Sequence, residues 1–189
     1  MGDLVVTEFI SLDGVIEDPG GAEKDRFPNG GWSFKFDRGA EGDQFKMEEL
    51  QAAEGQLLGR VTYEGFAAAW PKMASDPFVD KMNSMPKYVV SRSLQQPGWQ
   101  NSTVLSGELA EEVNAIKERH AGDILVAGSA SLVQSLTELG LVDEYRLMMF
   151  PVLLGGGKRM FRDDGELRNL KLVEHRPAGD TMILRYRTS

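Results

Sequence analysis

Short apolar runs alternate with longer segments of helical composition through most of the chain. The apolar runs are rich in β-branched residues and end at Gly, Ser or charged residues, which predicts short buried strands. They lie at 4–10, 56–60, 87–91, 103–106 and 123–127. Helices are predicted from about residue 42 and over 62–70, 75–85, 108–122 and 129–136.

Local signals predict several helix ends. Asp76 followed by Pro77 predicts an N-cap and a first helical residue, because aspartate accepts hydrogen bonds from the free N–H groups there and proline lacks one. Thr62 is the expected cap of the helix that it begins. The amphipathic segment 108–122 is expected to end at Gly122.

The chain ends in strands without helices between them. Residues 142–157 read as a long strand broken by Pro151 and a run of glycines, and 170–188 as a hairpin with its turn near 177–180. This order predicts an α/β fold, with a mostly parallel central sheet, helices on both faces and an antiparallel C-terminal hairpin. No repeat or clear linker interrupts the pattern, so residues 1–189 are expected to form a single domain.

Composition narrows the classes of function. The 189 residues carry a net charge of −8, and no segment supplies the basic stripe of a nucleic-acid binder, so nucleic acid is not an expected partner. The absence of cysteine excludes disulfides and thiolate metal sites, and the two histidines are far apart in sequence, so no metal is expected. The N-terminal apolar run is too short for a signal peptide or a membrane span, which predicts a cytoplasmic protein with no membrane partner.

Small, hydroxylic or basic residues follow three of the predicted strands. They are Gly59, Arg60 and Thr62; Ser91 and Arg92; and Gly128, Ser129, Ala130 and Ser131. In a parallel sheet these strand ends meet at one edge, where ligands bind, and helix N-termini with nearby arginines suit phosphate. Each join alone is better explained as a plain strand-to-helix turn. Together they favour a phosphorylated nucleotide, and NADP over NAD, because no acidic residue directly follows VVSR.

Five motifs give the chain a family resemblance: SLDGVI, LLGRVTYEGF, KYVVSRSL, ILVAGSASLVQSLTELGLVDEYRL and PVLLGGGKRMF. On these residues it resembles the dihydrofolate reductase superfamily, and more closely the C-terminal reductase domain of bacterial riboflavin-biosynthesis deaminase-reductases. The resemblance implies a dihydrofolate reductase-like three-layer fold. It also implies an NADPH-dependent reductase of a pyrimidine- or pteridine-like heterocycle, similar to the 5-amino-6-(5-phosphoribosylamino)uracil reductase of that pathway. The alternatives are a true dihydrofolate reductase and a dinucleotide-binding protein without catalysis.

The resemblance also assigns residues to the cofactor. The expected NADPH-binding residues are Ile16, Gly59, Arg60, Thr62, Ser91, Arg92, Gly128, Ser129, Ala130, Ser131 and Leu132. In this assignment Ile16 lies at the nicotinamide, Arg92 at the adenosine 2′-phosphate, and residues 128–132 at the pyrophosphate.

A reductase of this kind also needs a proton donor, and a carboxylate in a dry pocket can serve because burial raises its pKa. The resemblance implies such an acid on the helix that leads into GR-x-T, as in dihydrofolate reductases, and counting back along this helix gives Asp43. An acid in a first helical turn is explained equally well by the helix dipole. Asp37, in the loop before that helix, is the rival. Asp13 is expected to shape its turn and to reach the substrate, and Phe9, Trp32 and Asp37 are the expected substrate-binding residues.

Met148, Met149 and Phe150 make the strand before Pro151 strongly apolar. A dimer interface and a buried core strand explain this pattern equally well. The expected partners are therefore a small heterocyclic substrate and a second copy of the chain.

Overall fold

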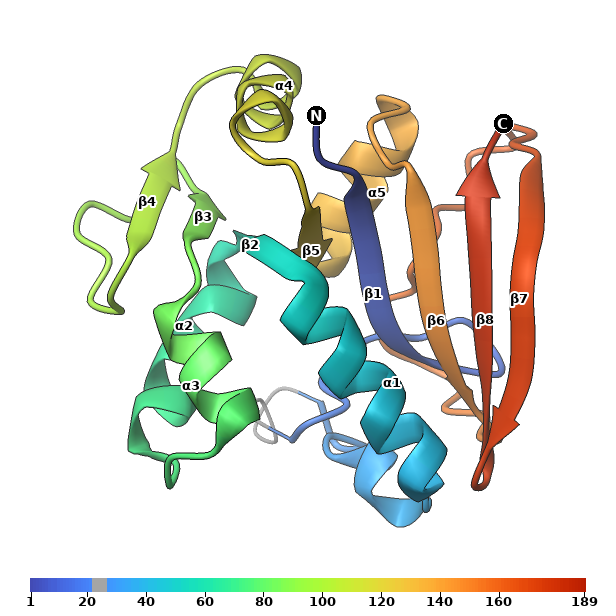
Figure 1. Ribbon diagram of the computed structural model, residues 1–189. Helices are drawn as coiled ribbons and strands as arrows, with labels where there is room; N and C mark the ends of the chain where they lie inside the picture. The colour runs from blue at the N-terminus through green and yellow to red at the C-terminus, as the bar shows by residue number, and fades with distance from the viewer. Residues whose placement is uncertain (22–26) are drawn as a thin grey trace.

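The structure, a computed structural model, describes residues 1–21 and 27–189. Within them, eight strands form one sheet in the order β4-β3-β2-β5-β1-β6-β8-β7 (Figure 1). The strands are β1 (Leu4–Ser11), β2 (Ala53–Gly59), β3 (Lys87–Val90), β4 (Ser102–Leu105), β5 (Asp123–Val126), β6 (Glu144–Phe150), β7 (Leu170–Ala178) and β8 (Thr181–Thr188). In the order of the sheet, the neighbouring strands from β4 to β6 pair in parallel. β8 pairs antiparallel with β6, and β7 pairs antiparallel with β8. The predicted sheet is confirmed.

Helices cover both faces of the sheet, as the pattern predicted (Figure 1). They are α1 (Gly39–Ala52), α2 (Arg60–Ala69), α3 (Pro77–Ser84), α4 (Leu109–Arg119) and α5 (Ala130–Glu138), with 3-10 turns at Trp32–Lys35 and Trp70–Lys72. One core cluster joins the sheet to α1, α2 and α3 through Leu50, Tyr63 and Met82. A second joins the opposite face to α4 and α5 through Val113 and Leu136. Burial on both faces explains why the central strands are almost entirely apolar.

Two strands that start side by side separate before they end. The β1–β5 ladder runs from Leu4–Ile124 to Val6–Val126 and stops there. On its other side β1 stays paired with β6 as far as Ser11–Phe150. The second half of β1 therefore has a neighbouring strand on the β6 side but none on the β5 side.

The predicted helix ends are confirmed in one case and wrong in others. Asp76 caps α3, its Oδ1 accepting hydrogen bonds from the N–H groups of Phe78 and Val79 at 2.8 Å. Thr62 does not cap α2, because that helix already begins at Arg60, directly after β2. Similarly α4 ends at Arg119, before Gly122.

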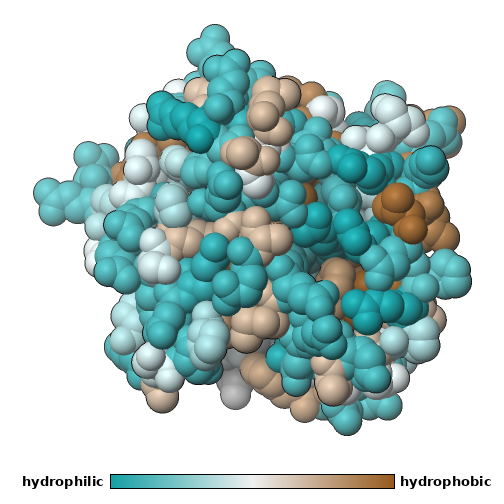
Figure 2. All heavy atoms as spheres, in the orientation of Figure 1, coloured by the Kyte–Doolittle hydropathy of each residue, from teal (hydrophilic) through white to brown (hydrophobic). Residues whose placement is uncertain are grey.

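The C-terminal strands differ from the prediction in length. β6 ends at Phe150, so the predicted strand over 142–157 stops before Pro151. Met148 and Phe150 are buried in a third core cluster within the chain, which favours the core interpretation of these side chains over the dimer interface. Exposed apolar side chains lie instead on the edge strand β7, at Leu172 and Val173, and Figure 2 shows a hydrophobic patch on this side of the molecule. Among the described residues, no helix is long and apolar enough to cross a membrane.

Candidate functional site

A cleft of about 530 Å³ opens at the C-terminal ends of the parallel strands. Its walls come from the ends of β2, β3 and β4 and from the start of α5. The predicted cofactor residues among its lining are Gly59, Arg60, Ser91, Arg92, Ser129, Ser131 and Leu132. The fold thus brings together three strand ends that are far apart in the sequence.

The N-termini of three helices converge on this cleft. The N-cap residues of α2, α4 and α5 are Gly59, Glu108 and Ser129, and all three line it. None of them makes a side-chain hydrogen bond to its helix, so their first N–H groups have no cap of this kind. Free N–H groups and the positive ends of helix dipoles make such a place suitable for phosphate.

Two glycines let the backbone segments behind the cleft pack closely. A Cβ added to Gly59 would lie 2.3 Å from Ser129 Oγ, and the Gly59 N–H donates to the Gly128 carbonyl at 3.2 Å. Gly128 has a φ of +91°, and a Cβ there would lie 2.8 Å from Thr62 Oγ1. Both positions therefore require glycine. Thr62 and Gly128, which were predicted to bind cofactor, pack against each other behind the lining of the cleft. Ala130, another predicted cofactor residue, is buried.

The two arginines of the cleft differ in their contacts. The Arg60 guanidinium donates to both carboxylate oxygens of Glu64 at 2.9 Å, so it would have to exchange this partner to bind a phosphate. Arg92 is exposed and has no ion-pair partner within the described residues. Beside it, Ser91 Oγ accepts hydrogen bonds from the N–H groups of Ser93 and Leu94 and so fixes the turn after β3.

Sequence reasoning missed a fourth contribution, from the end of β4. Ser106, Gly107 and Glu108 line the cleft next to the end of β3, with which β4 pairs. The signal was present, because TVLS is followed by a small residue and a helix, as in the other joins. Glu108 therefore places a carboxylate in the cleft, although no acidic residue directly follows VVSR in the sequence.

Asp13, a predicted catalytic residue, holds two loops together. Its carboxylate accepts hydrogen bonds from the Ser11 hydroxyl at 2.6 Å and from the N–H groups of Leu154 and Gly155 at 3.2 and 2.9 Å. These donors, the Ser11 hydroxyl first, lower the pKa of Asp13 to about 2. An acid with this pKa is ionised at neutral pH and has no proton to give, so these contacts support a structural role.

The other predicted acids lie at the surface. The Asp43 side chain is 65% exposed on α1 and pairs with Arg38 at 2.5 Å. Asp37 is exposed and accepts a hydrogen bond from the Gly39 N–H at 2.7 Å, at the start of the same helix. Neither residue lines the cleft. The surroundings of Asp43 and Asp37 therefore add no support to their predicted roles.

Two aromatic residues predicted to bind substrate are placed differently from each other. Trp32 is completely buried, its ring edge-on to Phe150 and its indole N–H bonded to the Glu17 carbonyl at 2.9 Å. It has no free ring face in this structure, so its surroundings add no support to the predicted stacking. Phe9 is half-buried, with Lys46 Nζ 5.4 Å from its ring centre. Ile16, predicted at the nicotinamide, is buried in the same core cluster as Leu132.

A buried acid that the sequence had not indicated lies on β1. Glu8 is 7% exposed, and it occupies the part of β1 that has separated from β5. Burial raises the pKa of Glu8 to about 8, the Glu49 charge adds to this rise, and the Lys46 charge and a hydrogen bond from the Gly128 backbone oppose it. The Glu8 carboxyl therefore lies against Gly128, and the next residue, Ser129, lines the cleft. With this pKa, Glu8 is largely protonated at neutral pH.

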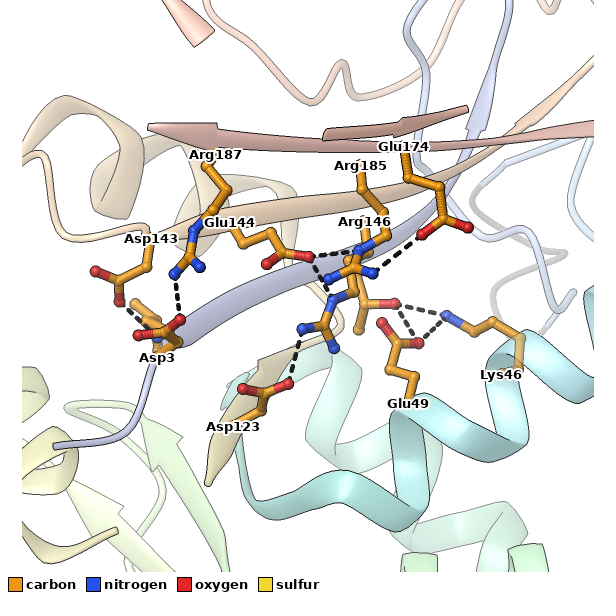
Figure 3. A network of polar contacts seen from close by, with 12 residues as sticks. Asp3, Lys46, Glu49, Asp123, Asp143, Glu144, Arg146, Glu174, Arg185 and Arg187 are labelled. Atoms are coloured by element: carbon orange, nitrogen blue, oxygen red, sulfur yellow. Dashed lines mark hydrogen bonds and ion pairs between the residues drawn. The ribbon is translucent and has the colours of Figure 1, made fainter. Parts of the chain in front are cut away.

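A polar cluster from β1 and α1 borders Glu8. Lys46 Nζ lies 2.7 Å from Glu49 Oε2 and 2.5 Å from Thr7 Oγ1, and the Thr7 hydroxyl donates to the same Glu49 oxygen at 2.8 Å. Figure 3 shows Lys46 and Glu49 reaching from α1 toward the sheet, beside the ion pairs of Arg146 and Arg185. Glu49 is buried, and its Oε1, like Glu8 Oε1, has no hydrogen-bond partner. Among the described residues, no group of three or more acidic, His or Cys side chains is placed to hold a metal ion.

Comparison with known proteins identifies the family. The family model of the RibD C-terminal domain matches residues 3–184. The chain belongs to the RibD C-terminal domain family. Uncharacterized protein YyaP of Bacillus subtilis is 38% identical over 125 residues, which cover 64% of this chain and 65% of YyaP, just under two thirds of its length. Uncharacterized protein YwjB of the same organism is 26% identical over 177 residues, covering 94% of this chain and 92% of YwjB.

Solved structures share the fold of this RibD C-terminal domain. A putative riboflavin biosynthesis protein from Shewanella sp. PV-4 matches with a TM-score of 0.76 and 19% identity over 99% of both chains. Acinetobacter baumannii RibD matches with a TM-score of 0.71 and 16% identity over all of this chain and 58% of its own. Enterococcus faecalis dihydrofolate reductase complexed with NADP(H) matches with a TM-score of 0.55 and 16% identity over 100% of this chain and 97% of its own. The predicted dihydrofolate reductase-like fold is confirmed, and the family supports a reductase of the riboflavin-pathway type.

Proposed function

We propose that this RibD C-terminal domain protein is an NADPH-dependent reductase of a pyrimidine- or pteridine-like heterocycle. The observation that carries the proposal is the convergence of three uncapped helix N-termini on one cleft that also contains Arg92. Such a cleft suits a ligand with several phosphate groups, and the family supplies the reductase activity.

The residues present fit a dinucleotide. The start of α5, with Ser129, Ser131 and the free N–H groups of its first turn, would hold the pyrophosphate, and Gly59 permits the close approach of this turn. Arg92 and the Ser91 turn would hold the adenosine phosphate. When bound, NADPH supplies a hydride, and the protein orients the ring and supplies the proton.

The preference for NADPH depends on two opposed charges. Arg92 favours the 2′-phosphate, whereas the Glu108 carboxylate in the same cleft disfavours it. We expect Arg92→Ala to weaken NADPH binding about tenfold or more and NADH binding little, and Glu108→Gln to tighten NADPH binding. Fluorescence titration of the bound cofactors measures both effects, with Arg119→Ala on the exposed end of α4 as the control. Equal losses for the two cofactors would contradict the 2′-phosphate assignment.

Turnover separates the substrate classes. Wild-type protein is incubated with NADPH and either 5-amino-6-(5-phosphoribosylamino)uracil or dihydrofolate, and cofactor oxidation is followed by absorbance. Oxidation with the aminopyrimidine supports the proposal, and oxidation with dihydrofolate alone supports the dihydrofolate reductase alternative. NADPH binding without oxidation by either substrate would instead indicate a non-catalytic dinucleotide-binding protein.

A further inference from the structure

We propose that Glu8 is the catalytic acid of this site and donates the proton that accompanies hydride transfer. This inference rests on the proposed reductase function. It is carried by the separation of β1 from β5, by the position of Glu8 against the Gly128 backbone, and by an unpartnered oxygen on its buried carboxyl.

The separation of the two strands gives Glu8 its position. The last β1–β5 pair is Val6–Val126, so Glu8 and Gly128 each lie two residues beyond it, on strands that no longer form a ladder. The Gly128 backbone bonds to the Glu8 carboxyl, and the following residue, Ser129, lines the cleft. Glu8 thus contacts the residue directly before the turn that would hold the cofactor.

The free oxygen of Glu8 indicates a ligand. Buried polar atoms in native proteins almost always have hydrogen-bond partners, and each exception calls for an explanation. Glu8 Oε1 has none, although the residue is 7% exposed. Glu49 Oε1, the second buried oxygen without a partner in this region, belongs to the Thr7–Lys46–Glu49 cluster. The N–H groups of an aminopyrimidine are suitable hydrogen-bond partners for Glu8 Oε1.

Burial keeps the proton on Glu8, against the larger of the two neighbouring charges, that of Lys46. Burial disfavours its carboxylate, and the Glu49 charge adds to this effect. The Lys46 ammonium, which would favour the carboxylate, is already bonded to Glu49 and Thr7. Glu8 therefore differs from Asp13, which its hydrogen-bond donors keep ionised, and from Asp43, which is paired with Arg38 at the surface.

The reduction balances with Glu8 as the acid. The carbon of a substrate C=N or C=O bond accepts a hydride from the reduced cofactor, and the electron pair of the double bond moves to the nitrogen or oxygen. That atom takes the proton from Glu8 as the new N–H or O–H bond forms. The hydride transfer would leave the nicotinamide oxidised, and the Glu8 carboxylate would regain a proton from water.

Glu8→Gln tests the assignment because the amide keeps the shape of the protonated acid but cannot release a proton at neutral pH. We expect it to bind NADPH within about threefold of wild type and to lower kcat with 5-amino-6-(5-phosphoribosylamino)uracil by about a hundredfold or more. In wild type, kcat should fall as the pH rises above about 8, and Glu8→Gln should remove this fall. Glu118→Gln, at an exposed position on α4, should change neither property.

A measurement without turnover completes the test. The infrared spectrum of wild-type protein should show a carboxylic acid C=O band at pH 7 that disappears with a midpoint near pH 8 and is absent from Glu8→Gln. A wild type without this band, or an active Glu8→Gln with an unchanged pH profile, overturns the role of Glu8 alone. A wild type that binds NADPH but oxidises it with neither the aminopyrimidine nor dihydrofolate overturns the proposed function, and the role of Glu8 with it.

Discussion

Replacing Glu8 by glutamine should make the protein more stable at pH 8 and change its stability little at pH 4. The pKa of Glu8 is about 8 in the folded protein, against an ordinary value of 4.5. Between these values the folded state keeps a proton that the unfolded state releases. The free energy of unfolding of wild type therefore falls as the pH rises through this window. At about 1.4 kcal/mol for each pH unit, the fall between pH 5 and pH 8 amounts to about 3 to 4 kcal/mol.

Chemical denaturation at several pH values from 4 to 9 measures this effect. The difference between Glu8→Gln and wild type should grow with pH up to about 8 and then level off, because above that pH the carboxyl is ionised in both states. Glu118→Gln corrects for the loss of one negative charge at an exposed position. A difference that stays constant across this range would show that Glu8 is ionised in the folded protein at neutral pH and would refute the reasoning.

Two further substitutions test the packing of the cleft and of the sheet. Gly59→Ala would place a carbon atom 2.3 Å from Ser129 Oγ, so it should cost about 1 to 3 kcal/mol of stability and weaken NADPH binding, whereas Gly98→Ala, in open space, should do neither. Arg146→Met removes a cation that pairs with both Asp123 and Glu144. Burial raises the pKa of Glu144, but its partners Arg185 and Arg146 lower it by more. The loss should be about 3 kcal/mol at pH 7 by urea denaturation and should shrink as the pH falls below 4.5 and through the lowered pKa of folded Glu144, where the contribution of this shift to stability disappears. A loss independent of pH would contradict this account.

The grouping of the strand ends around one cleft was predictable because its signals are local. A strand followed by a small residue and a helix start is visible in the sequence, and the parallel order of the strands brings such joins to one edge. The same reasoning missed Glu108 because it considered only the residues directly after VVSR. In the structure the neighbouring strand β4 supplies the carboxylate, one position before α4.

The buried acid was not predictable because its burial depends on tertiary register. Within LVVTEFI, Glu8 is the one charged residue of an apolar strand, a pattern typical of a side chain exposed on one face. Its surroundings arise because β5 separates from β1 after Val126 and α1 places Lys46 and Glu49 nearby. The complete burial of Trp32 was not predictable for the same kind of reason, since this loop aromatic packs against the distant Phe150.

The separation of β1 from β5 connects the two parts of the proposed site. If the ladder continued past Val126, the chain after β5 would stay hydrogen-bonded to β1 and could not turn at Gly128 into α5. The turn leaves the first N–H groups of α5 free for phosphate at the cleft and places the Gly128 backbone against the Glu8 carboxyl. The end of the β1–β5 ladder after Val126 thus gives the proposed site both its phosphate-binding turn and the buried position of its acid. Since burial keeps Glu8 protonated, the geometry that would hold the cofactor would also keep a proton available near it.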